Sequence, residues 1–161
     1  MRVTFPRLPD HEVAYSVVER DDGVVYRLRS GRAGTTLPHD IVRLVVERDL
    51  GITDGIWGGI AAGMVLSGLR DRIQRSETLG NLVETIAALD NPSPDEIRRL
   101  TGMKLSVLRM AEPPSPAVLG AAARSLQVEA ARWARLRPGQ ELSYDWSLPV
   151  ADRVPRPRDP R

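Results

Sequence analysis

The chain contains no cysteine and only one lysine, Lys104, among its 161 residues. The absence of cysteine excludes disulfides, thiolate chemistry and cysteine-based zinc or iron–sulfur sites. Because lysine is scarce, the basic isoelectric point of about 9.5 comes from arginine, a bias typical of GC-rich genomes. The net charge is only +2, and the basic residues are spread among 21 acidic ones. We therefore expect no nucleic-acid partner.

Long hydrophobic runs are also missing. The longest weakly polar run, residues 56–66, is far shorter than the ~20 residues that a membrane span requires. The first residues lack the apolar segment of a signal peptide. We therefore expect a soluble, cytoplasmic protein without a membrane partner. The turn at residues 51–55 lacks the Lys-Ser/Thr of a phosphate-binding P-loop, and no Gly-x-Ser-x-Gly hydrolase motif is present.

What is present is typical of one globular domain, with 42% hydrophobic and 27% charged residues. Alternating residues at 12–19 and 24–29 flank Asp22-Gly23, which can supply the positive φ angles of a tight turn, and predict a β-hairpin. Residues 3–5 are predicted to add a short edge strand. Residues 141–147 alternate in the same way and predict a strand that joins the hairpin. The faces expected to cover the helices are Val13, Tyr15 and Val17 in the first strand of the hairpin and Leu142, Tyr144 and Trp146 in the last strand.

Helical periodicity and capping residues predict helices at 38–50, 55–69, 76–90, 93–100 and 116–136, whereas residues 104–110 fit a helix or a strand. Thr35 or Thr36 is the predicted cap of the first helix, Thr53 or Asp54 that of the second and Ser93 that of the fourth. The predicted fold class is α+β, with the N-terminal hairpin and the C-terminal strand in a small antiparallel sheet packed on a bundle of about four to five helices. Residues 1–148 form the predicted domain, and residues 149–161 form an Arg- and Pro-rich tail predicted to be disordered.

The start of the first predicted helix gathers chemically useful side chains. His39, Arg43 and Glu47 are spaced by four and share a face beside Asp40, whereas Ile41, Leu44 and Val45 point the other way. Histidine titrates near neutral pH, and a helix N-terminus offers free N–H groups to an anion. The alternative is a solvated surface with an Arg43–Glu47 ion pair. Because the cation of Arg43 would repel a metal ion, we predict no metal and no cofactor here. The other histidine, His11, is predicted to be exposed.

A second feature is the spacing of Gly55, Gly59 and Gly63 by four residues in the second predicted helix. Glycine costs about 1 kcal/mol relative to alanine inside a helix, so three on one stripe need a reason. The stripe admits either a ligand or the backbone of a closely packed neighbour. If it faced His39, the two helices would bound a cleft with Trp57 at its mouth; otherwise Trp57 is a core aromatic.

Residues 37–64 carry the pattern Leu-Pro-His-Asp-x-Val-x-x-x-Val-Glu, then Leu-Gly and Trp-Gly-x-x-Ala-x-Gly. This segment resembles a group of uncharacterised actinobacterial proteins, and the resemblance implies no function. In that group the position of Arg43 is often histidine, which would make a better metal site. His39 and Asp40 also match part of the His-Asp-x-x-His motif of coenzyme Q biosynthesis proteins, but Arg43 replaces the second histidine, so no metal is carried over.

Two functions remain open from the sequence. The first is a binding or interaction protein whose cleft, between the first two helices, takes an anionic small molecule or a protein partner. Arg43, Trp57, Gly55 and Gly59 are its candidate binding residues. The alternative is a small enzyme in which His39 acts as general acid–base, Asp40 or Glu47 orients it, and Arg43 binds an anionic substrate. A homodimer is one assembly that this chain could adopt.

Overall fold

The computed structural model describes residues 1–9, 12–64, 70–108, 110 and 112–150. The elements are β1 (Arg2–Pro6), β2 (Val13–Glu19), β3 (Val25–Arg32), α1 (His39–Asp49), α2 (Ile56–Ala61), α3 (Arg70–Ala87), α4 (Pro94–Val107), α5 (Pro116–Arg135) and β4 (Glu141–Asp145). His11, residues 65–69 of the predicted second helix and residues 151–161 of the predicted tail lie outside the described residues.

The four strands form one antiparallel sheet in the order β3-β2-β1-β4, so the predicted α+β fold class is confirmed. The β2–β3 hairpin and β4 belong to this sheet, as predicted, but β4 pairs with β1 instead of with the hairpin. β1 is therefore an internal strand, not the predicted edge strand. It pairs with β2 on one side and β4 on the other, and its Val3 and Phe5 side chains are buried in the core.

The turn of the hairpin uses one positive φ angle, at Gly23 (81°). The N–H of Gly23 donates to the carbonyl of Arg20 at 2.9 Å. The Asp22 side chain stabilises the turn, because its carboxylate accepts a 3.3 Å hydrogen bond from the N–H of Val24. The prediction of positive φ at both residues of the Asp-Gly pair is thus wrong for Asp22, while the hairpin itself is confirmed.

The face of β2 that lies toward the helices is not the predicted one, which carries Val13, Tyr15 and Val17. Ser16 and Val18 are fully buried, whereas Val13 is 60% exposed. On the outer face the guanidinium of Arg27 lies 4.8 Å from the ring centre of Tyr15. Because both faces of this strand carry apolar residues, alternation alone could not decide between them. In β4 the expected face is confirmed, since Leu142 and Tyr144 are buried, as is Trp146 just after the strand.

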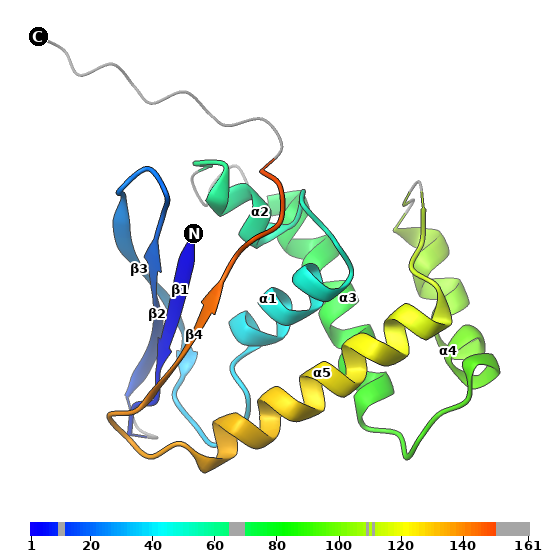
Figure 1. Ribbon diagram of the computed structural model, residues 1–161. Coiled ribbons are helices and arrows are strands. Elements are labelled where there is room, and N and C mark those ends of the chain that lie inside the picture. Colours follow the sequence, from blue (N-terminus) through cyan, green and yellow to red (C-terminus); the bar gives the residue numbers. More distant parts are fainter. Residues whose placement is uncertain (10–11, 65–69, 109, 111, 151–161) are drawn as a thin grey trace, which may run out of the picture.

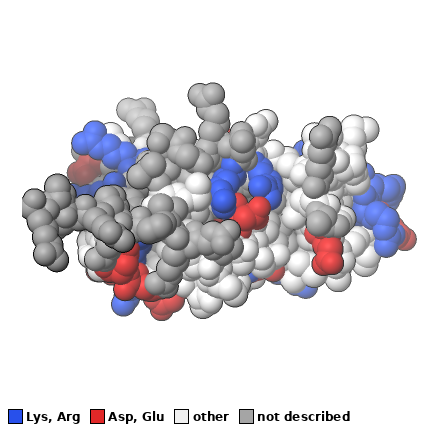
Figure 2. Space-filling view, turned by 90° about the horizontal axis from the view of Figure 1, so that it is seen from above, with Lys and Arg blue, Asp and Glu red and all other residues white. Residues whose placement is uncertain are grey.

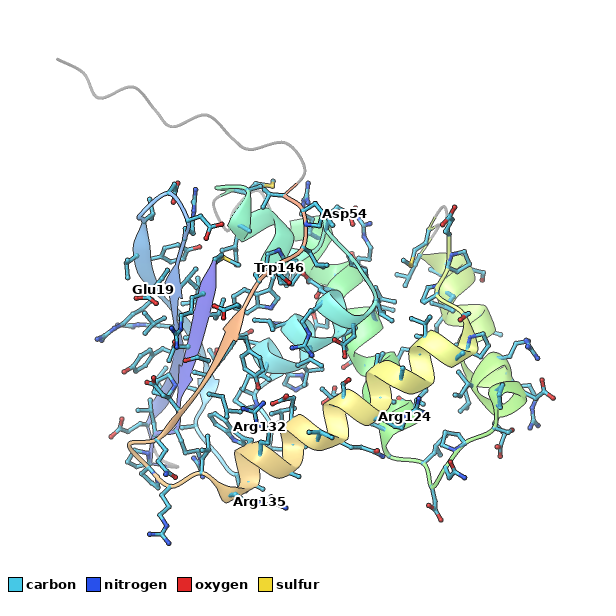
Figure 3. The ribbon with its side chains drawn as sticks, viewed as in Figure 1. Glu19, Asp54, Arg124, Arg132, Arg135 and Trp146 are labelled. Carbon is cyan, nitrogen blue, oxygen red and sulfur yellow. The ribbon has the colours of Figure 1, made fainter. Side chains whose placement is uncertain are left out.

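The helices cover one face of the sheet, with α1 nearest the strands, α5 crossing below it and α4 at the far side (Figure 1). α3 packs against both α1 and α5. Trp146 follows the end of β4 and lies beside the helices (Figure 3). The largest fully buried side chains are Trp57, Ile41, Leu44, Ile60, Leu79, Leu82, Ile86 and Leu119. The predicted inward face of the helix at 38–50, with Ile41, Leu44 and Val45, is therefore confirmed.

One polar network inside the structure joins β4 to α5. The Tyr144 hydroxyl donates to Glu129 Oε2 at 2.7 Å, and Arg132 Nη1 contacts both oxygens of the same carboxylate at 2.9 and 3.0 Å. Burial, followed by the hydrogen bond to Glu129, raises the pKa of Tyr144, so the hydroxyl keeps its proton and stays a donor. The hydrogen bonds of Glu129 thus connect the edge strand β4 to α5.

Several helix boundaries differ from the prediction. α2 has only six residues, whereas α4 continues to Val107, so most of the ambiguous segment 104–110 is helical. The capping box of Ser93 and Glu96 is confirmed. Pro38 is the N-cap of α1 and makes no side-chain cap, so the prediction of Thr35 or Thr36 is wrong. None of the described helices combines the length and the apolar character needed to cross a bilayer.

Candidate functional site

A pocket of about 580 Å³ opens beside the start of α1. The end of β3, the loop that follows it, the first turn of α1 and one side of α3 form its walls. Its charged or hydrogen-bonding lining residues are Arg29, Ser30, Thr36, His39, Asp40, Arg43, Glu77 and Glu84. The predicted residues His39, Asp40 and Arg43 therefore share one concave surface.

Asp40 anchors the floor of this pocket. Its carboxylate accepts a hydrogen bond from the Ser30 hydroxyl of β3 and a 3.0 Å hydrogen bond from Arg43 Nη1. The other terminal nitrogen of Arg43 lies 3.6 Å from Glu77 Oε1 of α3. An acidic residue in the first turn also complements the helix dipole. Asp40 and Arg43 are thus held in place by three elements before any ligand arrives.

His39 stands at the rim, with 71% of its side chain exposed. Its Nδ1 lies 4.0 Å from Glu84 Oε2 on α3, which is longer than a hydrogen bond. Asp40 is engaged by Ser30 and Arg43, so it does not orient the imidazole. A general acid–base histidine needs a nearby group that fixes its tautomer. This geometry favours ligand contact by His39 over catalysis.

The charges of the lining are mixed. Two arginines, Arg29 and Arg43, face three carboxylates, those of Asp40, Glu77 and Glu84. Arg43 is neutralised by two of these carboxylates. Arg29 is exposed and has no ion pair among the described residues. It is therefore the cation of the pocket that remains available to an anionic group.

Glu47 does not belong to this pocket, and the prediction that it lies on the exposed face of α1 is wrong. Its carboxylate is fully buried and accepts hydrogen bonds from the N–H groups of Ile56 at 2.8 Å and Trp57 at 2.9 Å. Burial raises the pKa of Glu47, although the hydrogen bonds from Trp57 and Ile56 oppose the shift. Glu47 is the side-chain acceptor for the first N–H groups of α2, so the predicted caps Thr53 and Asp54 are also wrong.

Trp57 is a core aromatic, which is the alternative that the sequence offers to a place at the mouth of a cleft. Only 1% of it is exposed, and its ring meets that of Phe5 edge to face at 6.0 Å. Its indole N–H donates to the Asp40 carbonyl at 3.2 Å. The space between α1 and α2 is thus filled by Glu47 and Trp57. The expected cleft between the first two helices is replaced by the pocket between α1, β3 and α3.

The three glycines do not form a helical stripe. Gly55 is the N-cap of α2, Gly59 is buried inside it, and Gly63 follows it with a φ of 93°. A Cβ atom on Gly55 would lie 2.2 Å from the Glu47 carboxyl carbon. Gly55 therefore lets the buried carboxylate approach the start of α2, and its close neighbour is a side chain of this chain instead of a ligand.

Sequence reasoning missed Arg29, Ser30, Glu77 and Glu84. Glu77 and Glu84 are seven residues apart and so share one face of α3, which is a signal that the sequence contains. The sequence does not show that this face of α3 packs beside α1.

Seen from above, the described atoms show Lys or Arg next to Asp or Glu in small groups, without a broad area of one sign (Figure 2).

Comparisons of the chain with protein-family models, with curated proteins and with solved structures found no match.

Proposed function

We propose that the protein is a small binding domain whose pocket beside α1 takes a polar small molecule carrying an anionic group and a hydrogen-bond donor. The proposal is supported by a difference in ion pairing between the two arginines of the pocket lining. Asp40 and Glu77 hold Arg43, whereas Arg29 lines the same pocket without an ion pair among the described residues. An anionic group would meet Arg29 and His39, and a donor would meet Glu77 or Glu84.

The pocket has a size and composition that suit such a ligand. A volume of about 580 Å³ lies within the roughly 300–1,000 Å³ of small-molecule sites. The hydrogen bond between Ser30 and Asp40 connects β3 to α1 at the floor, while the exposed His39 side chain at the rim is accessible to a ligand. A preformed floor lowers the entropic cost of binding.

Thermal-shift measurements and calorimetry test this proposal. The ligand panel holds amino acids, hydroxy acids and dicarboxylates, which combine anionic and hydrogen-bonding groups in different ways. The variants Arg29→Gln and His39→Ala should lose the shift that the best panel member causes in the wild type. Their unliganded melting temperatures should stay close to the wild-type value, because both side chains are exposed.

Arg98→Gln is the matched control, since Arg98 is an exposed arginine of α4 away from the pocket lining. It should bind the same panel member as tightly as the wild type does. A ligand that stabilises Arg29→Gln and Arg98→Gln equally well would show that it binds elsewhere.

A further inference from the structure

α4 exposes an apolar stripe to solvent. Only Ile97 and Thr101 of its 14 residues are buried. Leu100 is 42% exposed, Met103 82% and Val107 74%. Spacings of three and four residues place these three side chains on one face of the helix. They form the α4 stripe, a contiguous apolar surface on the helix farthest from the sheet (Figure 1).

Two residues of the α4 stripe, Met103 and Val107, line one wall of a groove. A depression of about 610 Å³ runs between α4 and α3, and Met103, Val107 and Leu108 form its apolar side. Gln74, Arg75 and Thr78 of α3 form the opposite side, and Lys104 completes the lining. These α3 residues are offset along the helix wheel from Glu77 and Glu84, so the groove and the small-molecule pocket occupy different faces of α3.

Every charged side chain in the lining of the groove is a cation. Arg75 Nη1 also binds Asp54 Oδ2 at 2.6 Å, whereas Lys104 has no ion pair among the described residues. Arg99 borders the other edge of the stripe on the helix wheel. The acid on the line of the stripe, Glu96, is engaged by the N–H and hydroxyl of Ser93. Lys104 and Arg99 thus lie at opposite edges of the apolar surface.

We propose that the α4 stripe and its groove dock an amphipathic helix of a partner protein, with acidic residues flanking that helix's apolar face. Apolar side chains spaced by three and four residues would bury the α4 stripe, which is the usual mode of helix-in-groove recognition. Carboxylates at the edges would meet Lys104 on one side and Arg99 on the other. The complementary charges would select the partner and its orientation.

A second copy of this chain, packed through Met103 in the middle of the α4 stripe, fits the surface less well. Two α4 helices packed antiparallel through Met103 would bring Lys104 of one copy beside Lys104 of the other. After Ile97 the charged residues of α4 are Arg98, Arg99 and Lys104, all cationic. Such a pairing would place like charges against each other, which opposes association.

Fluorescence anisotropy with a labelled synthetic helix tests the proposal. The probe is a peptide of about 18 residues with leucine at heptad positions a and d and glutamate at e and g, and the matched probe carries lysine in place of each glutamate. The wild-type protein should bind the glutamate probe at least about tenfold more tightly than the lysine probe, and added salt should weaken this binding.

Three variants of the full chain make the test specific. Met103→Asp should weaken binding of the glutamate probe about tenfold or more, because it puts a charge in the apolar contact. Lys104→Glu leaves the α4 stripe intact and should shift the preference toward the lysine probe. Val128→Asp is the control, since Val128 is exposed to 58% on α5, and it should bind as the wild type does.

Equal affinity for the two probes, or binding that Met103→Asp leaves unchanged, would overturn the proposal. So would sedimentation that shows a wild-type dimer dissociated by Met103→Asp, because a second copy would then cover the stripe. Lys104→Glu keeps the test decisive even if Met103→Asp disturbs the helix.

Discussion

At the scale of single residues, Glu47 joins α1 to α2 through a carboxylate that water does not reach. Burying a charge is costly unless hydrogen bonds compensate for the lost solvent. The N–H groups of Ile56 and Trp57 supply that compensation, and the positive end of the α2 dipole adds to it. The residue that sequence spacing assigned to a catalytic face is therefore a structural link.

The raised pKa of Glu47 gives a pH-dependent prediction. A folded-state pKa above the unfolded value means that the folded protein binds the proton more tightly. This contribution to the free energy of unfolding is fully present at pH values below the pKa of Glu47 in the unfolded chain. It is lost as the pH rises through the pKa of Glu47 in the folded protein. The free energy of unfolding of the wild type should therefore fall over that window relative to Glu47→Gln, whose side chain does not titrate.

Urea denaturation from about pH 4 to pH 8 measures this difference. Glu141→Gln, at an exposed position of β4, serves as the control and should follow the wild-type pH profile. Parallel profiles for the wild type and Glu47→Gln would contradict the assigned direction of the shift.

Gly55 offers a second prediction at this scale. Its added methyl group in Gly55→Ala would meet the Glu47 carboxyl carbon at 2.2 Å and Oε2 at 2.4 Å. The carboxylate would have to leave the start of α2, so we expect a loss of about 1–3 kcal/mol in unfolding free energy. Gly102→Ala is the matched control, because it lies inside α4 with open space around its Cβ. It should be stabilising by up to about 1 kcal/mol. If both variants changed stability in the same direction, the steric argument would fail.

At the scale of elements, α2 and α4 owe their helical state to different causes. α2 has six residues, all but one of them buried, and a helix this short does not persist alone in water. Packing in the core and the hydrogen bonds to the Glu47 carboxylate stabilise α2. α4 is longer and mostly exposed, so its stability depends on its own sequence and on the Ser93–Glu96 capping box. Local changes should therefore affect α4 more directly than α2.

Ser93→Ala should destabilise α4 by about 1 kcal/mol, since it removes the side-chain acceptor for the N–H of Glu96. The loss should show as reduced helical circular dichroism and as weaker binding of the glutamate probe. Ser106→Ala is the comparison, because the Ser106 hydroxyl bonds back to the Met103 carbonyl inside the helix. Alanine is a better helix former than serine, so this variant should keep its helicity. Equal loss in both variants would mean that the cap does not hold the helix.

At the scale of the whole molecule, the two ends of the described chain complete one structure. β4 pairs with β1 along its length, and the N–H of Trp146 donates to the Met1 carbonyl at 2.8 Å. Leu142, Tyr144 and Trp146 then close the core over the helices. The last strand is therefore part of the folded unit and not an appendage to it.

Two truncations distinguish the role of β4 from that of the C-terminal residues beyond it. Removing residues 141–161 deletes two buried aromatic rings, each worth roughly 3–5 kcal/mol, from a domain whose expected total stability is about 5–15 kcal/mol. We expect no cooperative unfolding transition in that protein. Removing residues 154–161 should leave the melting temperature unchanged, because the identified core is built from residues 1–148. Loss of folding in the shorter truncation would contradict this.

Features that depend on neighbours along the chain follow from local sequence patterns. Alternation at 12–29 and 141–147 indicated the strands, Asp22-Gly23 the turn, and Ser93 with Glu96 the start of a helix. Periodicity also assigned Ile41, Leu44 and Val45 to the core, because one helix face is enough to bury them.

Which residues meet across the fold depends on how distant segments pack. Periodicity placed Glu47 with His39 and Arg43, but the start of α2 lies against Glu47 and removes it from solvent. The pocket around His39 takes Arg29 from β3 and Glu77 from α3, residues that no local pattern relates to it. The order of the strands, with β1 between β2 and β4, likewise depends on which buried faces fit together. Such contacts join distant segments, so their free energy is a property of the packed molecule and not of any segment alone.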